Sequence, residues 1–181
     1  AMSRLFVKFF EWYAPYFNAY SFVLAREDEY EADAVSARVA GEAARVSALI
    51  RLEHASQWLT RRFLPKLQAR MRAQPQPPAQ YNALFAAALR ELPPIDIARL
   101  LTSAERDNDL TDTHPTLPQR VSAVGGPPVL RLQDVPAATL LGEALARIER
   151  KLDEVWREET RKPWAAAYAG AKADRERLDA L

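Results

Sequence analysis

The sequence of 181 residues has no cysteine, five glycines and two histidines. Without cysteine, the chain has neither a disulfide framework nor a thiolate metal site. A formal net charge of +1 excludes a strong overall field of the kind that attracts nucleic acid or an acidic surface. Glycine and β-branched residues are scarce beside alanine, leucine, arginine and glutamate, and this composition favours helices.

A hydrophobic run long enough to cross a membrane is also missing. The uncharged stretch at residues 12–25 is only fourteen residues long and is interrupted by Pro15, whereas a spanning helix needs about twenty apolar residues. Aromatic residues crowd this region, and at helical spacing we expect them to wrap most of the helix circumference. Such a helix is either buried on several sides or lies at a membrane interface. The aromatic residues are Phe6, Phe9, Phe10, Trp12, Tyr13, Tyr16, Phe17, Tyr20 and Phe22.

We therefore predict an all-α fold of seven or eight helices, with at most one short strand near Val129–Leu132. Proline and glycine place the expected breaks: a kink at Pro15, a stop at Gly41, a bend or end at Pro65, and an extended, exposed connector over 75–78. The expected helices are 3–24, 27–40, 42–65 with a final turn or two over 66–72, 80–91, 95–104, 116–124, one opening at 134–136, and one from 163 to 181.

Two carboxylates, Glu29 and Asp33, stand four residues apart and project from one helix face. In a zinc site, one such carboxylate ligates the metal while the other accepts the free N–H of a histidine ligand. The alternative is that these residues only meet the positive end of a helix dipole.

Three other features of the sequence are not expected to bind a ligand. Arginines and lysines between Arg38 and Arg72 form a basic stretch, but no aromatic platform or glycine-rich loop accompanies it, so we expect a solvated face and no nucleic-acid binding. His54 flanks an apolar stripe and is expected to pack rather than to bind a ligand. The polar loop at residues 105–114 lacks the alternating oxygen ligands of a calcium loop.

Residues 29–33, Glu-Tyr-Glu-Ala-Asp, resemble the E-x-x-A-D signature of the membrane-associated zinc metallopeptidases that include HtpX and the CaaX prenyl-protein endopeptidase. Asp112-Thr113-His114-Pro115, followed by Arg120, resembles the T-H-P…R segment of the same family. The order and separation of the two segments also match, and the resemblance covers about residues 5–125.

The resemblance implies a role for each candidate residue. Glu29 is the zinc ligand, joined by two histidines of an H-E-x-x-H helix, and Asp33 orients a ligand histidine. His114 stabilises the oxyanion, while Arg120 positions the loop or aids that charge. This sequence contains no H-E-x-x-H motif. We therefore expect the downstream part of a peptidase, inactive on its own and without tightly bound zinc, or a naturally truncated relative that has lost catalysis.

We assign residues 1–126 to the C-terminal part of a metallopeptidase domain and residues 127–181 to a helical hairpin that leads toward helical repeats. Implied partners are a protein or peptide substrate, a membrane surface, and a second copy bound through the N-terminal aromatic helix. The parent enzyme is expected to be membrane-associated and this part to face the cytoplasm. The alternative function is a non-catalytic helical module that binds partners through its apolar and basic faces.

Overall fold

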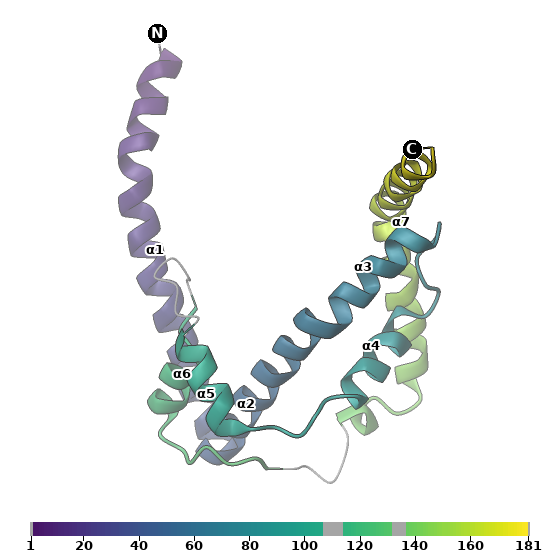
Figure 1. Ribbon diagram of the computed structural model, residues 1–181. Coiled ribbons are helices and arrows are strands. Elements are labelled where there is room, and N and C mark those ends of the chain that lie inside the picture. Colours follow the sequence, from purple (N-terminus) through teal and green to yellow (C-terminus); the bar gives the residue numbers. More distant parts are fainter. Residues whose placement is uncertain (1, 107–113, 132–136, 181) are drawn as a thin grey trace. The chain divides into compact units, whose positions relative to one another are not determined.

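The computed structural model describes residues 2–106, 114–131 and 137–180 (Figure 1). Within these ranges all regular structure is helical and no strand forms, which confirms the all-α prediction. Residues 129–131 of the expected strand have no regular structure, and Leu132 lies outside the described residues. The elements are α1 Met2–Ala40, α2 Glu42–Trp58, the π-helical η1 Leu59–Phe63, α3 Leu64–Ala73, α4 Tyr81–Arg90, α5 Ile97–Arg106, α6 Leu117–Val124, the 3₁₀ turn η2 Ala137–Leu140, and α7 Ala144–Asp179.

Helix α1 is continuous where the sequence predicted two helices. Pro15 lies inside it without ending it, and the junction at residues 24–27 stays helical because leucine, alanine, arginine and glutamate are all good helix formers. Gly41 ends the helix as predicted. Its φ of 90° is in the left-handed region, and its N–H donates to the carbonyl of Ala37 at 2.8 Å before α2 begins.

Pro65 does not end the helical segment that begins with α2. Proline has no N–H to donate to the carbonyl four residues earlier, and the preceding turn instead adopts π-helical bonding, with the N–H of Leu64 donating to the carbonyl of Leu59. The chain then continues directly into α3, with Pro65 in its first turn. The proline therefore changes the hydrogen-bond register and leaves the chain helical.

The chain forms two compact units that interleave in sequence. Unit 1 comprises residues 1–53 and 95–131, and unit 2 comprises residues 54–94 and 132–181. This division differs from the predicted boundary at 126/127. The reason is that the segment after Pro94 returns to the first half of α2, where it completes a core that α2 cannot close alone.

The core of unit 1 joins α2, α5 and α6. Its buried side chains are Val46, Leu49, Ile50, Leu100, Leu117 and Val121. Helix α6 has both of the predicted ends: a capping box between Thr116 and Gln119 begins it, and Gly125, with φ of 79°, ends it. Figure 1 shows α6 beside the C-terminal half of α1, and this packing carries the candidate site.

In unit 2, α7 packs against α3 and α4 as one helix of 36 residues, where the sequence predicted a hairpin. Pro163 lies within α7, and the next residue, Trp164, is fully buried and donates its indole N–H to the carbonyl of Gln74 at 2.8 Å. Tyr81 of α4 stacks on Trp156 of α7 with ring centroids 4.1 Å apart. The connector before α4 is exposed at Pro75, but contrary to prediction Pro78 is buried.

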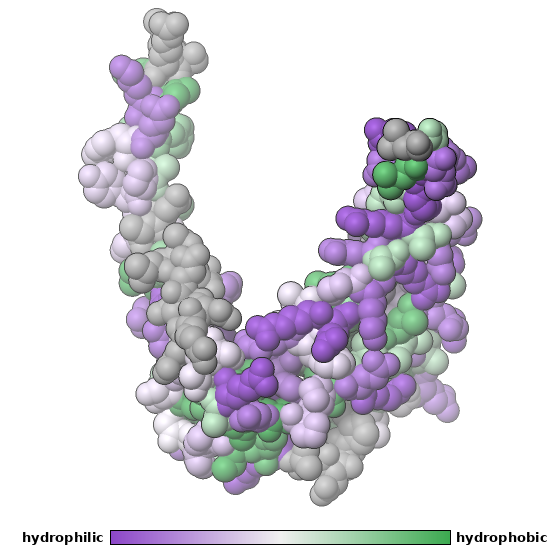
Figure 2. All heavy atoms as spheres, in the orientation of Figure 1, coloured by the Kyte–Doolittle hydropathy of each residue, from purple (hydrophilic) through white to green (hydrophobic). Residues whose placement is uncertain are grey.

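The N-terminal half of α1 does not bury its aromatic side chains. Trp12, Tyr16 and Tyr20 are 63%, 65% and 66% exposed, so the expectation of burial on several sides is not met within this chain. Figure 2 shows apolar surface along this part of the helix. Among the described helices, none is long and apolar enough to cross a membrane.

Candidate functional site

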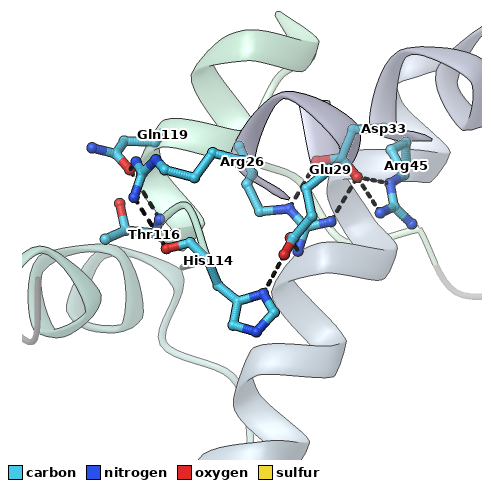
Figure 3. A network of polar contacts seen from close by, with 8 residues as sticks. Arg26, Glu29, Asp33, Arg45, His114, Thr116 and Gln119 are labelled. Atoms are coloured by element: carbon cyan, nitrogen blue, oxygen red, sulfur yellow. Dashed lines mark hydrogen bonds and ion pairs between the residues drawn. The ribbon is translucent and has the colours of Figure 1, made fainter. Parts of the chain in front are cut away.

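Glu29 and Asp33 lie one turn apart on the face of α1 that meets α6, and Arg120 of α6 bonds to both (Figure 3). Its Nη1 is 2.6 Å from Oε2 of Glu29. Its Nε and Nη2 donate to Oδ2 and Oδ1 of Asp33, each at 2.8 Å. This two-pronged pairing uses the fixed fork of the guanidinium and fixes the register of α6 on α1.

Asp33 accepts from a second guanidinium, that of Arg45 on α2. Nε of Arg45 donates to Oδ1 at 2.9 Å and Nη2 contacts the same oxygen. Asp33 is only 1% exposed, so the carboxylate is screened little by water. Burial, the largest single effect, acts to raise the pKa of Asp33, but the hydrogen bonds and charges of Arg120 and Arg45 together hold that pKa below its ordinary value. The hydrogen bonds that Arg120 donates to Asp33 in turn raise the pKa of Arg120.

His114 reaches the same cluster from the segment before α6. Its Nδ1 contacts Oε1 of Glu29 across 85 residues of sequence, while most of the ring stays exposed. Arg26 of α1 holds the segment: its Nη1 donates to the carbonyl of His114 at 3.3 Å and its Nη2 to the side chain of Gln119 at 2.6 Å. Pro115, next to His114, is buried. Asp112 and Thr113 lie outside the described residues.

The structure thus brings together all four residues that the sequence singled out: Glu29, Asp33, His114 and Arg120 (Figure 3). Sequence reasoning missed three others. Arg45 was counted within the basic stretch, although its place one turn after the Gly41 stop was a usable signal, because the first turn of α2 stays near the last turns of α1. Arg26 and Gln119 gave no signal that separates them from exposed polar residues.

His54, which the sequence analysis expected to pack rather than to bind a ligand, lies in unit 2 and takes no part in this cluster. Its Nε2 is 3.0 Å from the carbonyl oxygen of Pro93. This contact fixes the segment before α5, in keeping with the packing role predicted for it.

Whether this cluster fits a zinc ion depends on its donors. Glu29 Oε1 and His114 Nδ1 face each other, whereas Glu29 Oε2 is held by Arg120 and both oxygens of Asp33 are held by arginines. A catalytic zinc site takes three protein ligands. No group of three or more suitable side chains occurs among the described residues. The described part of the chain therefore does not form a zinc site by itself.

The family model of Peptidase family M48 matches residues 3–127, more than half of the chain. The chain belongs to peptidase family M48. The matched range holds the whole cluster and nearly coincides with the segment 1–126 assigned from the sequence. Comparisons with curated proteins and with solved structures find no match.

Among the described residues of this M48 chain, the family's two recognisable segments are in direct contact. The acidic segment on α1 supplies Glu29 and Asp33, and the histidine segment supplies His114 and Arg120. The cluster sets two carboxylates against the guanidiniums of Arg120 and Arg45. The oriented carboxylate of Glu29 is chemically suited to bind a cation or a proton donor.

Proposed function

We propose that this chain is part of a zinc-dependent endopeptidase of the HtpX type, which hydrolyses peptide bonds in membrane-protein quality control. The observation that carries the proposal is the contact between Glu29 and the pair His114 and Arg120 in a chain of family M48. The membrane association of the intact enzyme belongs to the same proposal and is supported by the motif resemblance alone.

Glu29 is the residue we propose as a metal ligand. Arg120 binds one of its oxygens and thereby fixes the plane of the carboxylate, which leaves Oε1 directed toward the mostly exposed ring of His114. The remaining zinc donors have to come from outside the described residues, in keeping with the H-E-x-x-H motif that the family resemblance implies. His114 is proposed to contact the substrate and Arg120 to position Glu29.

Asp33 has less capacity to accept a hydrogen bond from a ligand histidine than the resemblance implies. Its Oδ1 accepts from Arg45 and Arg120, and its Oδ2 accepts from Nε of Arg120. A carboxylate oxygen accepts about two hydrogen bonds, so only Oδ2 retains capacity for a histidine N–H. Because the side chain is almost fully buried, that histidine would have to displace neighbouring atoms to reach it. We therefore propose Asp33 foremost as the anchor between α1, α2 and α6.

The first experiment measures zinc binding to this chain by calorimetry at pH 7. We expect no binding at micromolar affinity, because Glu29 and His114 supply at most two donors. Micromolar affinity that Glu29→Ala removes would show that further ligands exist within the chain and would contradict the incomplete-site part of the proposal.

The second experiment uses the intact enzyme and separates metal content from turnover. Glu29→Gln is expected to remove most of the zinc, because the neutral amide is a poor ligand, whereas Glu31→Gln, an exposed neighbour on α1, should leave zinc and activity unchanged. His114→Ala is expected to keep the zinc and to lower turnover about a hundredfold, as loss of one oxyanion donor does. An empty metal site in His114→Ala would contradict its proposed role.

A non-catalytic interaction module is the second candidate function, and the exposed aromatic side chains of α1 favour it. The gene sequence upstream of Ser3 separates the two. An H-E-x-x-H motif within about a hundred residues supports the peptidase, and its absence supports the module.

A further inference from the structure

Most of the large apolar side chains at the N-terminal end of α1 lie on one side of the helix. At 3.6 residues per turn, these side chains occupy an arc of about 160° over residues 5–24, and Val7 and Phe22 lie outside it. Each large apolar side chain within the arc is exposed by 41% or more. This aromatic face consists of Leu5, Phe6, Phe9, Phe10, Trp12, Tyr13, Tyr16, Phe17, Tyr20, Val23 and Leu24.

The opposite side of the same segment carries fewer large side chains. It holds Ala14, Ser21, the aliphatic Val7, the partly buried Phe22, and one charge of each sign in Lys8 and Glu11. This side is therefore nearly neutral.

The rings of the aromatic face are already ordered against one another. Phe9 stacks on Tyr13 with centroids 5.5 Å apart, and Tyr13 lies 5.8 Å from Phe17. Trp12 lies 5.7 Å from Tyr16 on the next row. Because these contacts limit ring rotation before any partner binds, less side-chain entropy is lost on association.

The area of this face exceeds what a monomer ordinarily exposes. A buried aromatic side chain covers about 150–250 Å², and about half of each is exposed here, so the face presents on the order of 1,000 Å². The largest apolar patch on a typical monomeric protein is about 300–600 Å². One partner in a standard protein interface buries about 800 Å².

We propose that the aromatic face binds the aromatic face of a second copy of this chain, so that two α1 helices pair about a two-fold axis. The area matches one side of a standard interface. The composition, rich in aromatic residues and almost free of charge, is that of an interface core. A segment of twenty residues is about 30 Å long, enough for the whole face to pair with its copy. This dimer is independent of the proposed peptidase activity.

A lipid surface is the competing occupant, and the polar side of the segment argues against it. Helices that lie on membranes carry a lysine- and arginine-rich polar face, which binds anionic headgroups. Here Lys8 is offset by Glu11 on the same side. Pairing with a second copy requires no such charge.

The test compares two arginine substitutions on opposite sides of the segment. Phe9→Arg places a charge at the centre of the aromatic face, where two copies would meet, and Val7→Arg adds the same charge on the other side at similar exposure, 55% against 49%. Sedimentation equilibrium of the full chain at about 1–100 μM should show a dimer for the unsubstituted chain and for Val7→Arg. Phe9→Arg should weaken dimerisation at least a hundredfold. Unchanged far-ultraviolet circular dichroism would verify that both variants are folded.

Fluorescence of Trp12 gives a second readout. The emission of Trp12 is obtained by subtracting the spectrum of the Trp12→Phe variant from that of the unsubstituted chain. This emission should shift to shorter wavelength as the protein concentration rises, and acrylamide should quench it less in the dimer. A monomer at 100 μM, a polydisperse series of aggregates, or equal effects of Phe9→Arg and Val7→Arg would each overturn the proposal. So would a monomer that binds phosphatidylcholine vesicles through Trp12, because the occupant would then be lipid.

Discussion

The substitution Asp33→Asn tests whether the buried carboxylate anchors the candidate site. It keeps the size of the side chain and removes the charge on which Arg45 and Arg120 converge. It also replaces one carboxylate oxygen by an NH₂ group. A donor then faces a donor of Arg120 or Arg45, and at least one hydrogen bond is lost.

The magnitude follows from the number and kind of these bonds. Hydrogen bonds to charged groups contribute about 1.5–3 kcal/mol each, and breaking a buried ion pair costs about 3–5 kcal/mol. The side chains of Arg45 and Arg120 are 22% and 20% exposed, so water can hydrate part of the orphaned guanidiniums and limit the loss. We expect Asp33→Asn to lower the free energy of unfolding by about 3 kcal/mol at pH 7. The matched control Glu31→Gln, an exposed carboxylate on the same helix, should cost less than about 0.5 kcal/mol.

Urea unfolding followed by circular dichroism measures the difference. Because the chain forms two units, the transition should also be followed by tryptophan emission, to which unit 2 contributes Trp58, Trp156 and Trp164. The effect should be larger in circular dichroism than in emission, since Asp33 lies in unit 1. A loss below about 1 kcal/mol, equal to that of Glu31→Gln, would refute the anchoring role.

The pH dependence gives an independent check with a definite sign. The pKa of Asp33 is lower in the folded chain than in the unfolded chain, whose value is about 4. The stabilisation is therefore fully present above about pH 4 and is lost as the pH falls through the folded pKa. The difference in stability between the unsubstituted chain and Asp33→Asn should shrink below pH 4. A difference that stays constant down to the acid unfolding of the variant would contradict the linkage.

Three further outcomes are expected elsewhere in the chain. Gly126→Ala should lower the melting temperature, because the added Cβ would lie 3.0 Å from the backbone carbon of Glu42. A melting temperature equal to that of the unsubstituted chain would show that the segment around Gly126 and the start of α2 separate easily. Trp164→Phe should lower the free energy of unfolding by about 1–3 kcal/mol in denaturant titrations, since it leaves the carbonyl of Gln74 without the indole donor of the buried Trp164. Asp153→Ala should speed amide exchange at Asn82, whose N–H donates to Asp153 at 2.8 Å, and unchanged exchange there would contradict that cap.

The sequence predicted the helices whose ends carry chemical signals. Gly41 and Gly125 adopt the left-handed φ expected after a helix, and Thr116 begins α6 as a capping residue. The sequence failed where proline was taken to end or to begin a helix, because Pro65 and Pro163 lie in helical segments that continue past them. A helix tolerates the missing N–H when flanking helix formers or packing hold the next turn, and packing is not visible in a local pattern.

The sequence predicted which residues form the candidate site, but it did not predict all of the hydrogen bonds and ion pairs between them. Spacing placed Glu29 and Asp33 on one face, and the family segments supplied His114 and Arg120. The choice of Arg45 as the second partner of Asp33 depends on the core of Val46, Leu49 and Ile50, which sets how α2 packs after Gly41. Long-range packing of this kind cannot be read from periodicity.

Helix α1 carries both the aromatic face and part of the candidate site. The aromatic face occupies residues 5–24, and Arg26 and Glu29, which hold the histidine segment, follow within about one further turn of the same helix. A two-fold pairing of the aromatic faces would order α1 from its first turns, and this order would extend through the helix to Glu29. We therefore predict that Phe9→Arg, though it lies far along the helix from Glu29, speeds amide exchange around residues 26–33 in the dimeric concentration range, whereas Val7→Arg does not. Equal exchange in the two variants would show that pairing and the candidate site are uncoupled.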